Sequence, residues 1–592
     1  MLIPTLVILG GAHLAFAKCK CTPTEDCWPS VSAWDALNAT VDGKLIRNHP
    51  IAQPCYPGAG YSDERCEEIS ANWSTNSWLA QFPTGYSYPT IETCAAINAT
   101  LGEGHYPQCD LGNYPVYTVN ATGAKHLAAG INFAKDHDVR LVIKNTGHDI
   151  SQRSQGYGSL SIWIKSIKDG LHFQQTYTPS DGSCPSNYTG RAIKIGGGYV
   201  WDDVYNFAYK HGSIVVGGDD RTVGCIGGYL QGGGHGPASH QFGLGADQVL
   251  EYEVVLASGE LVTANECQHQ DLFAALRGGG GGTFGVVTSA TVKAYPELTA
   301  LGHELTIVAF PNASSELINA TADIVASYPS LVEAGYSGTG ALTHQDGALI
   351  YAHNFVNLLN DNSTAAINKA KDTMTQQIVN QWSPYNGTLF VIQSSFNTFN
   401  SFFKWYNSHP HISDGQNRPM MASRFFDKTS LSSQQSNMKN LLETLVSGQG
   451  TQTTTESATL FNLVAGGKVL DPQPLTSVNP AWRKTYVVMQ QIDFWPDNAG
   501  YEDIAQVKEA LTLKKLKAMK ELAPGMGTYG NEADPYDPDW RKDWWGTNYD
   551  WLVSVKKKYD PEDVFWCWRC VGNDAWAEVT GGTLYGPLCQ AT

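Results

Sequence analysis

The sequence predicts an α+β protein with a cysteine-rich cap at its N-terminal end. Apolar runs and helical spacings alternate regularly between residues 111 and 297, which is typical of a mixed unit of strands and helices. Residues 298–524 alternate longer helical stretches with strands, and they predict an α+β unit with an antiparallel sheet and helices on one face. Residues 18–110 are rich in Cys, Trp and Pro with little periodicity, so we expect a disulfide-stapled cap.

Length, charge and the N-terminal run limit the function. The 592 residues are too many for one hydrophobic core, and a net charge of −17 argues against nucleic acid and anionic membranes as partners. Residues 1–17 are apolar and end in Ala-Phe-Ala, which predicts a signal peptide, and no later run is long enough to span a bilayer. Secretion agrees with nine N-x-S/T sequons, which we take as glycosylation sites: Asn38, Asn72, Asn98, Asn120, Asn187, Asn312, Asn319, Asn362 and Asn386.

The thirteen cysteines favour disulfides. Seven lie in the N-terminal part and three near the C-terminus, and most of them should pair in a secreted chain. An odd count leaves at least one thiol without a partner in the chain, and Cys225 is a candidate. Zinc is the alternative for Cys567-x-x-Cys570, but no second pair of ligands stands nearby, so we expect no metal site.

The expected elements follow in order. Strands at 114–119 and 141–144 flank a helix with apolar residues at helical spacing, followed by a strand at 192–195 and a helix at 201–210. A hairpin of strands 249–257 and 260–263 precedes a short helix at 271–276 and a strand at 286–295. Later helices are expected at 314–328, 363–380, 429–447 and 504–522, and later strands at 346–356, 457–464 and 485–494.

One turn organises the first unit. The apolar strand Leu141–Lys144 stops abruptly at Asn145-Thr146-Gly147, and His148 and Asp149 follow at once. Backbone N–H groups at such a turn form a nest that can hold anionic phosphate, and the turn also fixes the histidine. A histidine beside a glycine turn is more often a surface or core residue, so the assignment depends on the rest of the chain.

A second region, residues 217–236, holds nine glycines in twenty residues. Each glycine costs backbone entropy, so we expect no core element here, but backbone that presses against a large flat or phosphorylated ligand. A flexible linker is excluded because the interleaved residues are apolar. The match of Gly280–Gly285 to G-x-G-x-x-G follows a helix and precedes a strand, the reverse of the nucleotide-binding order, and we discard it.

These motifs together carry a resemblance. The NTGHD turn, the TVGCIGGYLQGGGHG run, LEYEVVLASGELVTAN and FGVVTSATVKAYP resemble the FAD-binding domain of the vanillyl-alcohol oxidase / p-cresol methylhydroxylase (PCMH) superfamily. The tail from YGNEADPYDP to DPEDVFW is similar to a berberine-bridge segment. The chain as a whole resembles the secreted fungal berberine-bridge-like oxidases, including isoamyl alcohol oxidases.

The resemblance implies a domain plan. A signal peptide, 1–17, and a cap, 18–110, would precede a two-subdomain PCMH-type FAD-binding domain, 111–297. A substrate-binding domain would span 298–524, and the berberine-bridge segment, 525–592, would return to the FAD domain.

The resemblance also implies how FAD is held. A histidine at the position of His148 is joined to the flavin 8α-methyl, and many relatives add a link from a cysteine where this chain has Asp220. We therefore expect a single link through His148, with Cys225 as an open second candidate. Val223 falls where relatives control oxygen access, and valine there resembles the oxidases. Further residues expected to bind or pack against the cofactor are Lys144, Asn145, Thr146, Gly147, Asp149, Ser154, Gly224, Gly227, Gly228, Gly233, Gly234, His235, Leu244, Gly285, Val287 and Asn548.

The expected reaction follows from the flavin. A substrate C–H beside a hydroxyl would deliver hydride, a base would remove the hydroxyl proton, and O2 would be reduced to H2O2. Tyr529 is the candidate base, provided that its pKa falls well below 10, and Gln490 and Gln491 are candidates for substrate contact. We expect a monomer acting on an alcohol-type, phenolic or saccharide substrate. The alternatives are a carbohydrate oxidase and a flavin-carrying glycoprotein without a catalytic role.

Overall fold

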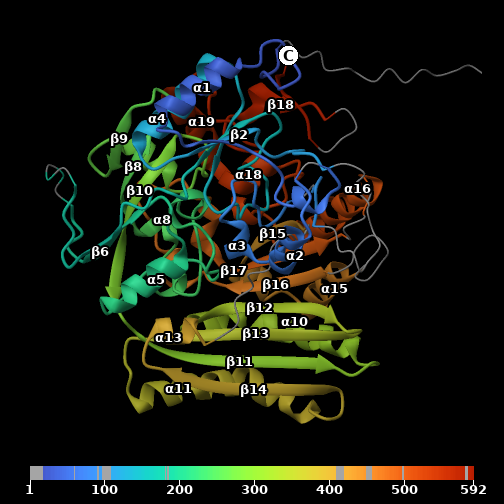
Figure 1. The fold of residues 1–592 in the computed structure, drawn as a ribbon. Helices are drawn as coiled ribbons and strands as arrows, with labels where there is room; N and C mark the ends of the chain where they lie inside the picture. The colour runs from blue at the N-terminus through green and yellow to red at the C-terminus, as the bar shows by residue number, and fades with distance from the viewer. Residues whose placement is uncertain are drawn as a thin grey trace, which may run out of the picture.

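The computed structural model describes residues 18–591 apart from 59, 90–91, 97–108, 181, 183, 185, 409–418, 448–456, 496–498, 500 and 581–584. The expected signal peptide, residues 1–17, and the sequon at Asn98 lie outside the described residues. The described residues form three large β-sheets and a small sheet near the C-terminus (Figure 1). Within this part of the chain, no helix is both long and apolar enough to cross a membrane.

The first sheet has four strands in the order β1-β2-β4-β3. Strand β4 pairs in parallel with both β2 and β3, and β1 pairs antiparallel with β2. The expected β-α-β unit is present, but β4, which the sequence did not indicate, separates its two strands. The elements are β1 (Leu45–Arg47), β2 (Tyr117–Asn120), α4 (Ala124–Asp136), β3 (Leu141–Lys144) and β4 (Leu160–Trp163).

The second sheet is antiparallel, with the order β5-β6-β10-β8-β9 and β7 paired to β10. The expected hairpin β8–β9 and closing strand β10 are confirmed. The elements are β5 (Leu171–Gln174), β6 (Arg191–Gly196), α5 (Trp201–Lys210), β7 (Ser213–Ile214), α6 (Leu230–Gly232), α7 (Ser239–Phe242), α8 (Gly245–Gln248), β8 (Val249–Val255), β9 (Leu261–Asn265), α9 (Gln270–Leu276) and β10 (Val286–Pro296).

The third sheet has seven antiparallel strands in the order β14-β11-β13-β12-β16-β17-β15. The sequence indicated three of these strands, whose observed bounds are β13 (Ala348–Leu359), β16 (Ser457–Leu463) and β17 (Thr485–Phe494). It did not indicate β11 (Thr299–Ala309), β12 (Tyr336–Gln345), β14 (Phe390–Phe399) and β15 (Pro419–Asp427). The helices are α10 (Ser314–Glu333), α11 (Thr364–Met374), α12 (Asn380–Trp382), α13 (Phe402–Tyr406), α14 (Lys428–Leu431) and α15 (Gln435–Val446).

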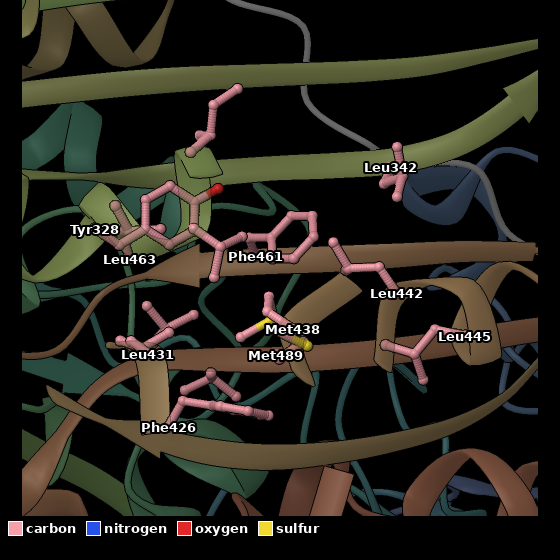
Figure 2. Packing of buried hydrophobic residues seen from close by; sticks show 14 of the residues in the cluster. Tyr328, Leu342, Phe426, Leu431, Met438, Leu442, Leu445, Phe461, Leu463 and Met489 are labelled. Carbon is pink, nitrogen blue, oxygen red and sulfur yellow. The ribbon is translucent and has the colours of Figure 1, made fainter. Parts of the chain in front are cut away.

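Helices α10, α14 and α15 cover one face of the seven-stranded sheet. Figure 2 shows Met438 and Leu442 of α15 with Phe461 of β16 and Met489 of β17, and these side chains are buried. Burying a side chain of this size contributes roughly 1.5–3 kcal/mol. Because these helices cover one side of the sheet, only its other side is available for contact with the rest of the molecule.

The cap is confirmed as a disulfide-rich segment, and its described residues include the helices α1 (Val31–Thr40), α2 (Asp63–Asn72) and α3 (Asn76–Leu79). Trp34 of α1 is buried and stacks on Tyr117 of β2 at 4.1 Å between ring centroids, which attaches the cap to the first sheet. The disulfides are Cys19–Cys589, Cys21–Cys27, Cys55–Cys66, Cys94–Cys109, Cys184–Cys267 and Cys567–Cys570. The Cys567–Cys570 bond agrees with the rejection of zinc there.

The C-terminal tail packs against the second sheet, and Figure 1 shows α18 and α19 among the elements of the first half of the chain. Lys556 of α19 donates to Thr283 O at 2.9 Å. The bond Cys19–Cys589 then joins the two ends of the described chain. The tail elements are α16 (Tyr501–Ala510), α17 (Lys517–Leu522), α18 (Trp540–Trp545), α19 (Tyr549–Tyr559), β18 (Trp576–Glu578) and β19 (Leu588–Gln590).

Candidate active site

The turn after β3 lies against the cap. Gly147 has φ +82°, which favours glycine, and a Cβ there would lie 2.5 Å from the Gly85 carbonyl oxygen. The Ser87 amide donates to Gly147 O at 3.1 Å. The cap therefore forms one wall of this turn, which the sequence did not indicate.

His148 projects from this turn into a polar cluster. Its Nε2 donates to Asp220 Oδ2 at 3.2 Å, and the Tyr88 hydroxyl lies 3.4 Å from the same nitrogen. Burial alone would raise the pKa of Asp220, but the His148 interaction and two hydrogen bonds from Thr222 outweigh it and lower the pKa. Asp220 is thus an ionised partner that orients the His148 ring at neutral pH.

Three of the residues expected to bind or pack against the cofactor make hydrogen bonds within the protein instead. Lys144 is fully buried and donates to Phe82 O at 3.0 Å, so its ammonium lies behind the turn. The Asp149 amide donates to Gly147 O, and the Asp149 carboxylate accepts from the amide and hydroxyl of Ser154 at 2.7 and 3.0 Å. Asp149 and Ser154 therefore stabilise the loop. The Asp149 amide is not free to bind phosphate, because it donates to Gly147 O.

The glycine-rich run corrects the expectation of a region outside the core. Residues 225–229 form a short helical segment that is kinked at Gly227, where the backbone is not helical, and α6 follows; Cys225 and Ile226 are fully buried. A Cβ on Gly224 would lie 2.4 Å from Asn145 Nδ2, so glycine allows the run to touch the turn after β3. Glycine here permits close contact between backbones within the core.

Cys225 is the free cysteine that the odd count required. Its side chain packs among the apolar residues that surround Trp201 and Tyr205. Burial raises the pKa of the Cys225 thiol well above its ordinary value. A buried, protonated thiol is a poor nucleophile, so the surroundings favour the small hydrophobic role for Cys225.

Some of the other residues expected to bind the cofactor border open space, and others are packed in the core. A Cβ added at Gly227 or Gly228 would meet no atom within 4 Å among the described residues, so this stretch of backbone borders open space. Val223 is half-buried beside the run. Three positions are packed into the core by backbone or side chain: Leu244, Gly285 and Val287.

A second polar cluster forms where the glycine-rich run meets β17 and the tail. His235 Nε2 donates to the Glu532 carboxylate at 3.0 Å, and the Gln490 side-chain amide donates to the same carboxylate. Tyr529 is buried and accepts from the Gly234 amide at 3.2 Å. The His235 and Tyr529 rings meet edge to face with centroids 5.1 Å apart. The expected residues Tyr529, Gln490 and His235 thus belong to one site.

The alternation of β17 separates the two glutamines. Gln491 is fully buried and bonds to Thr459 Oγ1 at 2.7 Å and to Asp493, which pairs with Lys515. Successive strand residues point to opposite faces, so Gln490 alone can reach Glu532. The expectation of Gln491 as a substrate contact is therefore wrong. Asn548 donates to Val478 O at 2.9 Å and thereby fixes the tail.

Five residues of the two clusters were not predicted in these roles: Tyr88, Arg153, Asp220, Asn531 and Glu532. Arg153 donates to Asn531 Oδ1 at 2.8 Å and joins the turn after β3 to the tail. A carboxylate directly after the Tyr-x-Asn motif was the available signal for Glu532. No sequence signal places Tyr88, which comes from a segment without periodicity.

The residues present fit a flavin nucleotide. Within the described chain, the buried side-chain oxygens near the turn that have no hydrogen-bond partner include Asn145 Oδ1 and Ser151 Oγ. Buried polar atoms rarely remain unpaired, so a ligand with polar groups is expected beside them. The open backbone at Gly227 and Gly228 supplies the adjoining flat surface.

Comparisons with known proteins agree with this geometry. The family model described as FAD binding domain matches residues 115–265, and the model described as berberine and berberine like matches residues 528–569. These matches and the site define an FAD-linked oxidoreductase.

Relatives extend the similarity over the whole chain. The FAD-linked oxidoreductase apf9 of Gibberella fujikuroi is 36% identical over 98% of this chain and 98% of its own. The FAD-linked oxidoreductase patO of Penicillium expansum is 32% identical over 100% of this chain and 98% of its own. The crystal structure of the VAO-type flavoprotein MtVAO713 from Myceliophthora thermophila C1 superposes with a TM-score of 0.89 at 35% identity, covering 97% and 100% of the two chains. The chain belongs to the berberine-bridge-like FAD-linked oxidoreductases of the vanillyl-alcohol oxidase superfamily.

Proposed function

We propose that this protein is a secreted oxidase that holds FAD covalently through His148 and oxidises an alcohol-type substrate with O2. The observation that carries the proposal is His148 itself, fixed on the turn after β3 with Nε2 engaged by Asp220 at 3.2 Å. Its Nδ1 forms no hydrogen bond within the described chain, so this nitrogen is free for the bond to the flavin.

The surrounding residues would hold the rest of the cofactor. Asn145, Thr146 and Gly147 are the candidates for phosphate and ribityl contact, with Gly227 and Gly228 against the ring system. The flavin would supply hydride acceptance from carbon and reoxidation by O2. Val223 lies beside the run, where we propose that a small side chain leaves access for O2.

On the substrate side, we assign the wall of the site to Tyr529, Gln490 and His235. Tyr529 would orient a substrate hydroxyl by hydrogen bonding, since burial and the nearby Glu532 raise its pKa above the ordinary value. Trp482, edge to face with Tyr529, adds an apolar surface. This mixture suits a hydroxyl attached to an apolar or aromatic group.

Secretion completes the proposal. Residues 1–17 would be removed as a signal peptide, and six disulfides agree with an oxidising compartment. Four of the sequon asparagines are exposed in the structure: Asn187, Asn312, Asn362 and Asn386. We expect the mature protein to act as a monomer.

The test is anaerobic mixing of the purified holoenzyme with isoamyl alcohol, vanillyl alcohol and cellobiose. At least one alcohol should bleach the flavin absorbance, and readmitted O2 should restore the colour with one H2O2 per flavin. Bleaching by cellobiose alone would make the protein a carbohydrate oxidase. A flavin that stays oxidised with all three compounds would favour a flavin-carrying glycoprotein without a catalytic role.

A further inference from the structure

We propose that His235 is the general base of the reaction and that Glu532, held by Gln490, is the residue that positions it. This inference rests on the proposed oxidation of an alcohol. It assigns to a His–carboxylate pair the proton transfer that the sequence assigned to Tyr529.

The pair is assembled from three separate parts of the chain. His235 follows Gly234, whose φ of +69° turns the glycine-rich run towards the tail. Glu532 ends the short helical turn Gly530–Glu532, and Gln490 reaches it from β17. The two Glu532 oxygens lie 3.1 and 3.0 Å from His235 Nε2. A carboxylate fixed from two sides in this way can hold the imidazole in one orientation.

The contact also fixes which nitrogen carries the proton. An ionised carboxylate only accepts hydrogen bonds, so Nε2 bears the hydrogen and Nδ1 keeps its lone pair. Nδ1 has no hydrogen-bond partner within the described chain. A carboxylate behind a histidine fixes its tautomer and stabilises the imidazolium that forms, as in hydrolase triads. His235 Nδ1 is therefore a suitable proton acceptor.

Tyr529 is less suited to accept a proton. It is buried, it already accepts from the Gly234 amide, and its hydroxyl also bonds to Asn531. Because its ring lies edge to face with His235, both side chains can contact one substrate hydroxyl. The phenol would donate to the substrate oxygen while the imidazole accepts the proton.

The reaction then balances as R-CH2-OH + O2 → R-CHO + H2O2. The substrate O–H bond breaks and its proton passes to His235 Nδ1, while the C–H bond breaks and its hydrogen leaves with two electrons to the flavin. O2 would take those two electrons and two protons to give H2O2. One proton is returned by His235, and the other is the hydrogen that left the substrate carbon.

The experiment measures flavin reduction and histidine reactivity in the holoenzyme across pH 5 to 9. The variants are His235→Ala and Glu532→Gln, and the matched controls are His172→Ala and Glu521→Gln, which lie outside the site and are exposed. Acid-stable flavin and thermal midpoint confirm that each protein is folded and loaded.

Anaerobic reduction by isoamyl or vanillyl alcohol, whichever reduces the wild type faster, should slow by ~10²–10⁴-fold in His235→Ala and remain unchanged in the controls. The wild-type rate should rise with pH, because a general base acts in its unprotonated form. The charged and titratable groups near the ring are Glu532, Tyr529 and, through Asn531, Arg153. A carboxylate beside an imidazole favours the charged form of the ring, so in Glu532→Gln the pH midpoint of flavin reduction should move about one pH unit or more downwards.

A second readout needs no substrate. Carbethoxylation of His235 by diethyl pyrocarbonate, followed by peptide mass mapping, should show the same downward shift in Glu532→Gln, with His172 as the internal reference. Unchanged reduction in His235→Ala, or an unshifted midpoint in either readout, would overturn the inference. If no alcohol reduces the wild type, the proposed function fails, and carbethoxylation still decides whether Glu532 controls His235.

Discussion

The two histidine–carboxylate pairs of this molecule are alike in geometry and differ in surroundings. His148 and Asp220 lie 3.2 Å apart, and His235 and Glu532 lie 3.0 Å apart, each through Nε2. The first pair is enclosed by the cap and the FAD domain, through Tyr88 and Thr222. The second is built where that domain meets the tail and the seven-stranded sheet. In the proposed mechanism the first pair holds the cofactor and the second moves the substrate proton.

The largest expected effect separates the two roles. His148→Ala should abolish acid-stable flavin, because Cys225, the free cysteine of the chain, is buried and its thiol cannot replace the histidine. Acid-precipitated wild type should be yellow, and the variant pellet should be colourless. His235→Ala is the matched control and should keep its covalent flavin. Equal flavin in both pellets would remove the distinction between the pairs.

The next effect tests Asp220. Asp220→Asn keeps the size of the side chain but removes the charge that stabilises a positive His148 ring. Loss of such assistance should slow covalent attachment by roughly 10²-fold. In-gel flavin fluorescence measured over time after adding FAD to the apoprotein checks this. Glu253→Gln, a carboxylate on the second sheet outside both pairs, is the control, and attachment equally fast in Asp220→Asn would contradict the role.

Tyr529→Phe should have a smaller effect than His235→Ala. The phenol contributes a hydrogen bond, and losing one costs roughly 0.5–1.5 kcal/mol, or up to about tenfold in rate. Stopped-flow reduction of the two variants under the same conditions makes the comparison. A loss of 10²-fold or more in Tyr529→Phe would return the base to the tyrosine.

A histidine without a carboxylate sharpens the comparison further. His303 in β11 is fully buried between aromatic rings, with Ser394 Oγ 2.9 Å from Nε2, and burial lowers its pKa to about 4. In the unfolded chain its pKa is near 6.5, so its contribution to stability is complete above that pH. This contribution to the free energy of unfolding is on the order of 3 kcal/mol, and it is lost as the pH falls towards 4.

The corresponding measurement is the thermal midpoint of wild type and His303→Phe between pH 4 and 7. The wild type should lose stability on acidification more steeply than the variant, and covalent flavin and activity at pH 7 should hardly change. Parallel curves would show that His303 is not the group responsible.

The sequence predicted the turn after β3 and the glycine-rich run better than it predicted the seven-stranded sheet, for a physical reason. The turn after β3 and the glycine-rich run are local features, so their residues and spacing identify them. Strands β11, β12, β14 and β15 were missed because their pairing is long-range, and several carry Gly, Asn or Ser where a strand is read from apolar alternation. The glycine-rich run was placed outside the core because composition does not show that its apolar residues pack together.

The candidate site was predicted in the same uneven way. His148, His235, Gln490 and Tyr529 were named from motifs, and the structure brings the last three together. The carboxylate partners of the two histidines were not predicted, because Asp220 is 72 residues from His148 and Glu532 is 297 residues from His235. Contacts over such separations depend on how the cap, the tail and β17 meet.

The most direct test of the account is tandem mass spectrometry of a tryptic digest of the wild-type holoenzyme. We predict the mass of FAD on the peptide that contains His148, with the fragment ions assigning it to that residue. The peptide that contains Cys225 should carry no flavin. An unmodified His148 peptide in flavin-replete protein, or flavin on Cys225, would contradict the assignment of His148 as the residue that holds the cofactor.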